Sequence, residues 1–451
     1  MTYNYRFLAR IIIEAVTPLV IKSGNKNILT DGVVLRDVND LPYIPGTSIG
    51  GVLRHAWKDE GKDVDTIFGF QHGDKGEGSK LILSEARILD AGGKVIDGLQ
   101  EITDSFLNNY KQLPIRQHVR ITDKGVAADK GKFDEEIVYA GTRFCFEMEM
   151  LSKEDNRSTF DDLLSTLQSQ IFRLGSGTRK GFGEIKIVSI WERTLNLQNR
   201  EDLDVYLSKS SNLEDSKGWY TEKVNHASKE TEWTCYKLQL TPSDFFLFGS
   251  GFGDDEADMT PVKERKVIWD GELAQLGEYS YLVPASSIKG AIAHRVAFYY
   301  NKLKGNYADL LSDEDKKKHI GKNNEAVKSL FGSEGDEKGQ GKQRGNVLFS
   351  DLYLEAETDK LLNHVSIDRF TGGAIDGALF TEKVTYGRRQ NYVIELFVND
   401  QTIEEDIMKA LDLALDDICK GMLPLGGGVN RGHGTFSGEI LKNGGVLCVE
   451  R

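Results

Sequence analysis

The sequence predicts an α+β fold in which two domains of the same kind follow one another along the chain. Two observations carry this prediction. Five sequence blocks recur in the same order in the two halves of the 451 residues, and each half repeats one succession of strand-like and helix-like segments. Recurrence of whole blocks in a fixed order indicates an internal repeat, so we interpret the chain as a tandem duplication.

The blocks form pairs, one member in each half. The first pair is a glycine followed seven positions later by an aspartate, at Gly24 and Asp31 and at Gly251 and Asp258. The other four pairs are residues 43–51 with 282–290 ("YIPGTSIGG" and "LVPASSIKG"), 67–88 with 330–354, 118–141 with 364–387, and 174–183 with 425–434 ("LGSGTRKGFG" and "LGGGVNRGHG").

Each half is expected to run strand, turn, helix, strand, hairpin, strand, helix, glycine loop, strand. Residues 80–89 and 346–355 alternate apolar and polar side chains as half-buried strands do. Residues 158–174 carry apolar residues at helical spacing, and a second helical stretch opens with Thr402 and Glu405 in capping-box positions. This βαββαβ order predicts two tandem ferredoxin-like (RRM-type) domains with inserted hairpin loops.

A polar stretch separates the two halves. We place the first domain at residues 1–195, a linker at 196–228 and the second domain at 229–451. The linker lacks sustained hydrophobic periodicity, so we expect at most one short helix in it.

The composition predicts a soluble, cytoplasmic protein. The longest apolar runs are too short to span a bilayer, and the opening residues "MTYNYRFLARI" do not have the layout of a signal peptide. The four cysteines form no CxxC pair, which favours reduced structural thiols over a zinc site or a disulfide framework.

The formal net charge of −13 argues weakly against a nucleic-acid partner. The argument is weak because affinity for phosphate depends on local clusters of Lys and Arg and not on their sum. Here the basic residues gather near the glycine loops and turns.

The start of the helix after each Pro turn is a candidate phosphate site. Thr47 or Ser48 in the first half, and Ser286 or Ser287 in the second, are predicted to cap the helix, and the remaining free amides would attract an anion. The basic side chains that would reach a phosphate backbone from these helices are Arg54, His55, Lys289 and His294. The alternative is a plain N-cap followed by a helix with a charged surface.

The two glycine loops are a second candidate. Neither has the GxxxxGK[ST] pattern and neither leads from a strand into a helix, which argues against a P-loop or dinucleotide site. Glycines allow close approach of the backbone, and the basic residues add positive charge, as a sugar-phosphate chain requires. The residues concerned are Gly175, Gly177, Arg179 and Lys180 in the first loop, and Gly426, Gly428, Asn430 and Arg431 in the second. The alternative is a tight helix-to-strand connection.

The blocks that begin at His118 and His364 predict a long protruding loop or β-hairpin in each half. Their glycines and small residues leave backbone exposed for wedging against a stack of bases. The two histidines are candidates for RNA contact, although such histidines are more often structural than catalytic.

These motifs together resemble the RAMP superfamily of CRISPR effector proteins, and in particular the backbone subunits of type III complexes. Two units in one chain resemble the tandem-fused subunit of type III-D complexes. The block "LVPASSIKG" departs from the pattern because Ala285 replaces the glycine. The resemblance implies an antiviral ribonucleoprotein in which the chain binds guide RNA (crRNA), complementary target RNA and other CRISPR effector subunits.

The resemblance also implies that the chain is an endoribonuclease. The family's cleaving aspartate corresponds to Asp31 in "TDGVVLRD", and the spacing from the glycine makes Asp258 its counterpart. Each would hold Mg²⁺ (or Mn²⁺), and attack of the RNA 2′-hydroxyl would leave a cyclic phosphate and a 5′-hydroxyl. Asp254 or Asp255 could take the place of Asp258, or the second half could only bind.

Three functions remain open at the level of sequence: a guide-assembled nuclease, a structural backbone subunit without cleavage, and a nuclease that processes the guide precursor. The third usually needs a His, Tyr or Lys acid–base pair, and the sequence shows no convincing pair. By residue statistics alone, Asp31 would be read as a turn residue.

Overall fold

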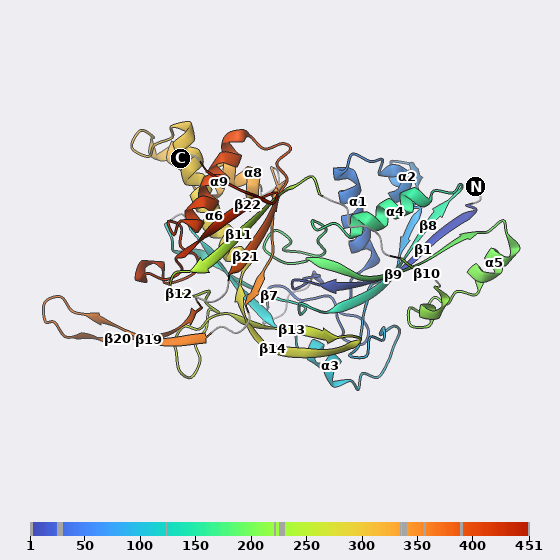
Figure 1. Cartoon of the computed structure of the whole chain (residues 1–451), viewed down its shortest axis with the longest axis horizontal. Coiled ribbons are helices and arrows are strands. Elements are labelled where there is room, and N and C mark those ends of the chain that lie inside the picture. Colours follow the sequence, from blue (N-terminus) through green and yellow to red (C-terminus); the bar gives the residue numbers. More distant parts are fainter. Residues whose placement is uncertain are drawn as a thin grey trace.

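The structure is a computed structural model that describes residues 3–24, 30–122, 124–220, 222–224, 231–333, 335, 341–354, 358–387 and 391–449. Figure 1 shows two lobes side by side, the amino-terminal half in blue to green and the carboxy-terminal half in yellow to red. A long hairpin leaves the second lobe and projects away from it (Figure 1).

The first half contains an antiparallel sheet with the strand order β9-β1-β8-β4. Numbered within this half, that order is 4-1-3-2, the arrangement of a ferredoxin-like sheet, so the predicted fold class is confirmed. The strands are β1 (Tyr5–Ala15), β4 (Leu81–Leu83), β8 (Arg143–Ser152) and β9 (Ile185–Asn196), with β5 (Arg87–Ile88) beside β8 and β10 (Glu222–Val224) beside β9.

Two helices, α1 (Gly46–Asp59) and α4 (Arg157–Leu167), pack against each other and against this sheet. In α1 the buried side chains are Ile49, Leu53 and Trp57, which are four residues apart and therefore share one face. This apolar stripe joins the core of the first half.

The second half repeats the arrangement. Its sheet has the order β17-β21-β11-β22, again 4-1-3-2 when read from β22. Its helices bury the corresponding stripe: Ile288, Ile292 and Val296 in α6 lie where Ile49, Leu53 and Trp57 lie in α1. The elements are β11 (Thr234–Pro242), β17 (Val347–Phe349), β21 (Tyr392–Val398), β22 (Phe436–Lys442), the short β23 (Gly445–Val446), α6 (Ala285–Lys304) and α9 (Glu405–Cys419).

Each half carries the predicted hairpin. In the first half it is formed by β6 (Ile115–Ile121) and β7 (Ala127–Glu136), and in the second by β19 (Thr358–Ile367) and β20 (Ala374–Tyr386). The second hairpin is the one that projects in Figure 1, and β12 (Phe245–Phe246) pairs with its base.

A further hairpin of the second half, β13 (Lys263–Asp270) and β14 (Leu273–Val283), packs on the first half. The indole N–H of Trp269 donates to the carbonyl of Gly141 at 2.8 Å, and Val267 is buried in the core of the first half. The two halves therefore share an extensive junction, and β18 (Leu352–Leu354) joins this hairpin to the second lobe.

The segment between the halves is attached to the first sheet. It contains the one short α-helix that the sequence suggested, α5 (Arg200–Leu207), followed by η2 (Asp215–Trp219) and β10. Arg10 of β1 donates to the hydroxyl of Ser216 at 2.9 Å, so this stretch is anchored and does not run free between the lobes.

The remaining short elements are α2 (Asp65–Phe68), β2 (Phe70–His72), β3 (Lys75–Glu77), α3 (Ser105–Asn108), η1 (Asn109–Lys111), α7 (Asp313–His319), η3 (Gly321–Asn323), α8 (Glu325–Phe331), β15 (Gly332–Ser333), β16 (Gln343–Arg344) and η4 (Val429–Arg431). None of the helices in the described ranges is long and apolar enough to cross a membrane. All four cysteines are free.

The predicted helix caps are wrong. Helices α1 and α6 begin one residue after a proline, Pro45 and Pro284, and neither start has a side-chain capping hydrogen bond. Because the proline is the N-cap residue, the hydroxyls of Thr47, Ser48, Ser286 and Ser287 lie inside the first turn. Helix α9 likewise begins after Glu404, so Thr402 is not its cap.

Candidate functional site

The base of each hairpin is built in the same way in the two halves. The segment after Asp31 pairs with β7 through a parallel bridge between Gly32 and Glu135, and the segment after Asp258 pairs with β20 through a parallel bridge between Met259 and Glu382. Asp31 and Asp258 are both exposed. The structure therefore places these two aspartates at equivalent positions, as the spacing from the glycine predicted.

In the first half a second carboxylate lies beside Asp31. The amide N–H of Asp31 donates to the carboxylate of Asp134 at 2.9 Å, and the amide of Asp134 returns a longer bond to Asp31 at 3.4 Å. Mg²⁺ in proteins is commonly held by one or two carboxylates together with substrate phosphates, so Asp31 and Asp134 fit such an ion.

In the second half a hydroxyl takes the place of this carboxylate. The carboxylate of Asp258 accepts from the amide of Thr381 at 2.7 Å and from its hydroxyl at 3.1 Å. The second position thus offers one carboxylate. Within the described ranges, no cluster of three or more His, Cys, Asp or Glu side chains is arranged to hold a metal by itself.

Asp254, the alternative to Asp258, is engaged elsewhere. Its carboxylate pairs with Lys383 and accepts from the amides of Glu256 and Ala257, both at 2.9 Å. Lys383 and these two amide N–H groups stabilise the charged carboxylate, which lowers the pKa of Asp254 to about 2. Asp255 is exposed, and it is Asp258 that occupies the place equivalent to Asp31.

Behind Asp31 lies a buried glutamate, Glu135, which is 3% exposed. It contacts His118 Nε2 at 3.2 Å and Lys22 Nζ at 2.9 Å, and the ring of His118 stacks on Phe133 with centroids 4.8 Å apart. Burial alone would raise the pKa of Glu135, but its close contacts with His118 and Lys22 outweigh burial and lower the pKa to about 2. These contacts give His118 a structural role.

Behind Asp258 lies Glu382, which is fully buried and has more side-chain partners than Glu135. Its carboxylate contacts His364 at 2.8 Å, His433 at 2.9 Å and Arg431 at 2.6 Å. Burial acts to raise the pKa of Glu382, but its bonds with His433, Arg431 and His364 lower it below its usual value. His364 also stacks on Phe380, as His118 stacks on Phe133.

Glu135, Glu382 and His433 were not among the residues that the sequence predicted for the site. The blocks 118–141 and 364–387 have equal length, and without a gap they place Glu136, not Glu135, opposite Glu382. The equivalence of Glu135 with Glu382 and of Phe133 with Phe380 follows from the strand register of the two hairpins. A buried partner for a histidine cannot be identified from that alignment without knowing which face of the hairpin is covered.

Four of the predicted RNA-contacting glycines are explained by the chain's own packing. All four have positive φ, and a Cβ added to any of them would lie 2.4–2.6 Å from another atom of the same half. For example, a Cβ at Gly177 would meet the ring of Phe182, and one at Gly428 would meet His433. The glycines are Gly175, Gly177, Gly426 and Gly428, and RNA approach at them stays a prediction.

The first glycine loop packs on the start of α6 in the second half. Gly181 forms a parallel bridge with Ser350, and a Cβ at Gly181 would lie 2.4 Å from Asp351 Oδ1 and 2.5 Å from the Cβ of Ala285. Nearby, Arg116 of β6 is buried and pairs with Glu264 at 2.6 Å and with Asp351. Loop, hairpin base and helix start are thus brought together across the junction.

Three of the predicted basic residues meet at this junction: Arg179 and Lys180 from the first half and Lys289 from the second. Arg179 Nε donates to the carbonyl of Gly345 at 2.9 Å, but its buried Nη1 has no hydrogen-bond partner among the described residues. Burial and the neighbouring Arg344 and Arg173 lower the pKa of Arg179 to about 9. Burial, Lys180 and Arg179 lower the pKa of Lys289 to about 8.

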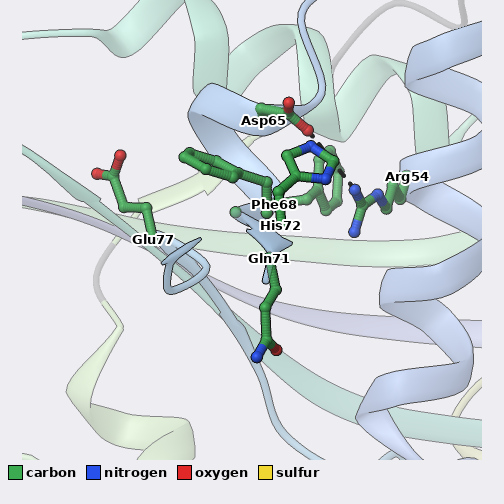
Figure 2. A pocket seen from close by; sticks show the side chains of 8 residues that line it. Arg54, Asp65, Phe68, Gln71, His72 and Glu77 are labelled. Atoms are coloured by element: carbon green, nitrogen blue, oxygen red, sulfur yellow. Dashed lines mark ion pairs between the residues drawn. The ribbon is translucent and has the colours of Figure 1, made fainter. Parts of the chain in front are cut away.

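The other predicted residues are more exposed. Arg54 is 3.7 Å from Asp65 and lines an open cavity of about 390 Å³ (Figure 2). His55, His294 and Asn430 are exposed at the surface.

Comparison with known proteins identifies one family. The family model described as the RAMP superfamily matches the chain in two regions, residues 12–186 and 218–437, which together span most of its length. The two matches fall on the two halves that share the ferredoxin-like sheet order. No curated protein matches the sequence.

Proposed function

The chain belongs to the RAMP superfamily of CRISPR-associated proteins, and we propose that it is a guide-RNA-binding backbone subunit of a type III effector complex. In this proposal it holds the duplex of guide and target RNA, contacts other effector subunits and cleaves target RNA at Asp31 and Asp258. The tandem arrangement of two RAMP units in one chain supports the subunit type.

The observation that carries RNA binding is the cluster of Arg179, Lys180 and Lys289 at the junction. A buried cation without a counter-charge destabilises a protein, and the lowered pKa of Lys289 reflects that cost. A phosphate of the guide would supply the missing negative charge and accept from the free Arg179 Nη1. Contacts of this kind position the backbone and carry no base preference.

The two hairpins suit the role of wedges between bases. Their exposed faces carry large apolar side chains, among them Val119, Ile121 and Val126 in the first hairpin and Phe370 at the tip of the second. Phe370 is 100% exposed. An exposed aromatic ring on a protruding hairpin can stack on a base of any identity.

For cleavage we propose that the RNA 2′-hydroxyl attacks the adjacent phosphate where the hairpin distorts the target strand. Asp31 lies at the hairpin base and would orient the hydroxyl or take its proton, leaving a cyclic phosphate and a 5′-hydroxyl. A Mg²⁺ or Mn²⁺ ion, when held by Asp31 and Asp134, supplies positive charge for the phosphate. Glu135 and His118 would act as the buried support that fixes β7 behind Asp31.

For the second half, binding without cleavage is the alternative. The observation that favours it is the replacement of Asp134 by Thr381, which leaves Asp258 as a lone carboxylate. An acidic segment, including Asp254 and Glu256 paired with Lys383, lies close by and would repel a phosphate.

The test is cleavage of a guide-matched RNA by the reconstituted complex with wild-type chain, Asp31→Ala, Asp258→Ala and the double variant. We expect each single substitution to remove one specific cut while target binding is retained, and Asp255→Ala to cut like wild type. Loss of only the Asp31 cut would assign a binding role to the second half. If both single variants cut like wild type, the chain is a scaffold.

A further inference from the structure

One loop of the second half contacts the hairpin of the first half. This bridging loop, residues 249–260, leads to Asp258 and lies against β6–β7. Lys132 Nζ lies over the ring of Phe252, 5.2 Å from its centroid. A Cβ added to Gly251 would lie 4.0 Å from the Cβ of Gln117. The bridging loop therefore packs on the hairpin face that carries Gln117 and Lys132.

The same face of the hairpin carries the first candidate cleavage site. Gln117 is paired with Asp134 across the hairpin, and Gln117 Nε2 donates to Asp134 Oδ2 at 3.3 Å. Asp134 accepts from the amide of Asp31 at 2.9 Å. Lys132 precedes Asp134 by two positions in β7, and residues two positions apart on a strand share one face at a spacing of about 7 Å. Phe252 of the second half therefore lies near the Asp31 site.

The acidic part of the bridging loop is held away from that site. The carboxylates of Asp254 and Glu256 both pair with Lys383 on the second hairpin, Glu256 at 2.8 Å. The loop thus spans the two hairpins, with its acidic side chains on the second and the ring of Phe252 against the first. The negative charges that would repel RNA are neutralised where they lie.

Hydrogen bonds within the bridging loop hold Phe252 in place. The amide of Ser250 donates to the carbonyl of Thr260 at 2.8 Å, and the hydroxyl of Thr260 donates to the carbonyl of Phe252 at 2.9 Å. Phe252 is nevertheless 55% exposed, and Lys132 lies over one face of its ring. An ordered, exposed aromatic ring can stack on a base with little loss of conformational freedom.

The first half has no aromatic residue at this place. The glycine that aligns with Gly251 is Gly24, and the residue after it is Asn25, which lies outside the described residues. One of the two equivalent loops therefore carries a stacking residue, and that loop lies against the hairpin of the other half.

We propose that Phe252 is a positioning residue for cleavage at Asp31, and that the base of the nucleotide whose 2′-hydroxyl attacks stacks on its ring. This inference rests on the proposed cleavage function and gives the second half a part in the first site. Stacking of the base fixes the ribose that carries the hydroxyl, so the hydroxyl and the adjacent phosphate are held in line beside Asp31. Because every base has a face that can stack, no base preference is expected.

The test follows single-turnover cutting of guide-matched RNA by the reconstituted complex, with the target fully bound so that affinity does not contribute. We expect Phe252→Ala and Phe252→Leu to slow the Asp31-dependent cut by about tenfold, the factor that stacking of one base supplies. Phe252→Trp should restore the rate. The matched control is Tyr307→Ala, which removes another half-exposed ring and should cut like wild type.

A second target carries an abasic ribose at the attacking nucleotide and retains its 2′-hydroxyl. With no base to stack, Phe252→Ala and wild type should cut this target at the same rate, and the cycle isolates the contact between ring and base. Equal slowing of both targets would show a merely structural effect on the bridging loop and would overturn the proposal. A loss confined to the Asp258-dependent cut would also overturn it.

A fluorescence measurement separates this inference from the proposed function. 2-Aminopurine is placed at successive target positions in the complex with Asp31→Ala, and one position should brighten when Phe252→Ala is added. If Asp31→Ala cuts like wild type, the cleavage function and this inference both fail. If Asp31→Ala loses its cut but no 2-aminopurine position responds to Phe252→Ala, this inference alone fails.

Discussion

The two hairpins have equivalent backbone pairing at their bases, but only the first is bound to the other half of the chain. The first, β6–β7, is fixed at its base by the second half, where Arg116 pairs with Glu264 and Asp351 and Lys132 lies over the ring of Phe252. The second, β19–β20, has Leu362 where the first has Arg116, and it projects from the lobe (Figure 1). Of the two hairpins that the duplication produced, β6–β7 is the inner copy, packed between the halves, and β19–β20 is the outer copy, which lacks this contact.

The difference extends to the charges at the two hairpin bases. At the first base, Asp31 and Asp134 lie at the surface and the buried Glu135 contacts one histidine and one lysine. At the second base, Asp258 is the one such surface carboxylate among the described residues, and the buried Glu382 contacts two histidines and an arginine. Equivalent backbone therefore does not imply equivalent chemistry, and substitutions at paired positions can separate the two.

The largest difference is expected at Arg116 and its counterpart. Arg116→Ala leaves Glu264 and Asp351 buried without their cation, and breaking a buried ion pair in this way costs about 3–5 kcal/mol of the free energy of unfolding. Leu362→Ala should cost about 1 kcal/mol, because Leu362 has no such partners. Chemical denaturation measures both, and equal losses would contradict the distinction between inner and outer copies.

The paired glycines Gly181 and Gly432 should differ by a smaller amount. Alanine is strained at both because φ is +107° and +89°, which costs about 1–2 kcal/mol. Only at Gly181 would the new Cβ also meet Asp351 and Ala285, and this overpacking adds about 1–3 kcal/mol. The same denaturation experiment tests the pair; a Gly432→Ala loss as large as that of Gly181→Ala would show that the outer loop is also packed.

RNA affinity should depend on pH through Lys289, for which the first half has Gly50. The pKa of Lys289 in the free protein is about 8, and a bound phosphate favours the charged form and raises that pKa. Binding therefore takes up a proton above about pH 8, and affinity should fall by at most about tenfold per pH unit. Titrations of RNA from about pH 7 to about pH 9 measure the fall.

Lys289→Arg is the matched variant for that titration, because arginine stays charged over this range. Its affinity should change much less with pH than that of wild type. A pH dependence that persists unchanged in Lys289→Arg would assign the proton to another group.

The smallest expected effect is on the salt dependence of RNA binding. Affinity should fall steeply with salt, and Lys180→Gln should reduce the slope of log affinity against log salt by about one. Arg431→Gln, at the paired position, should reduce it less because Glu382 already neutralises Arg431. A flat salt response of wild type would count against phosphate binding altogether.

The sequence predicted the architecture because its blocks occur twice in the same order and its apolar residues recur at helix and strand spacing. The block pairs identified the duplication, and the apolar residues spaced four apart in α1 and α6 are the ones that the structure buries. The helix caps were mispredicted because Ser and Thr near a helix start are common caps, whereas here the preceding proline already fixes the entry of the chain.

The candidate site was predictable only in part. The spacing from a glycine was enough to relate Asp31 to Asp258, because both aspartates follow the glycine by seven positions and the residue after each pairs with its hairpin in the same way. The junction was not predictable, since Arg116, Glu264 and Asp351 are far apart in sequence and each looks like an ordinary surface charge. Burial of Arg179 and Lys289 is likewise a property of the assembled pair.

The hairpin β13–β14 has a consequence for the synthesis of the chain. Val267 lies in the core of the first half, so that core cannot be completed when only the amino-terminal half has left the ribosome. Nascent domains generally fold in order of their emergence. Here the first unit must wait for residues of the second, and a gene split between the two repeats would leave the amino-terminal product with part of its apolar interior open to water.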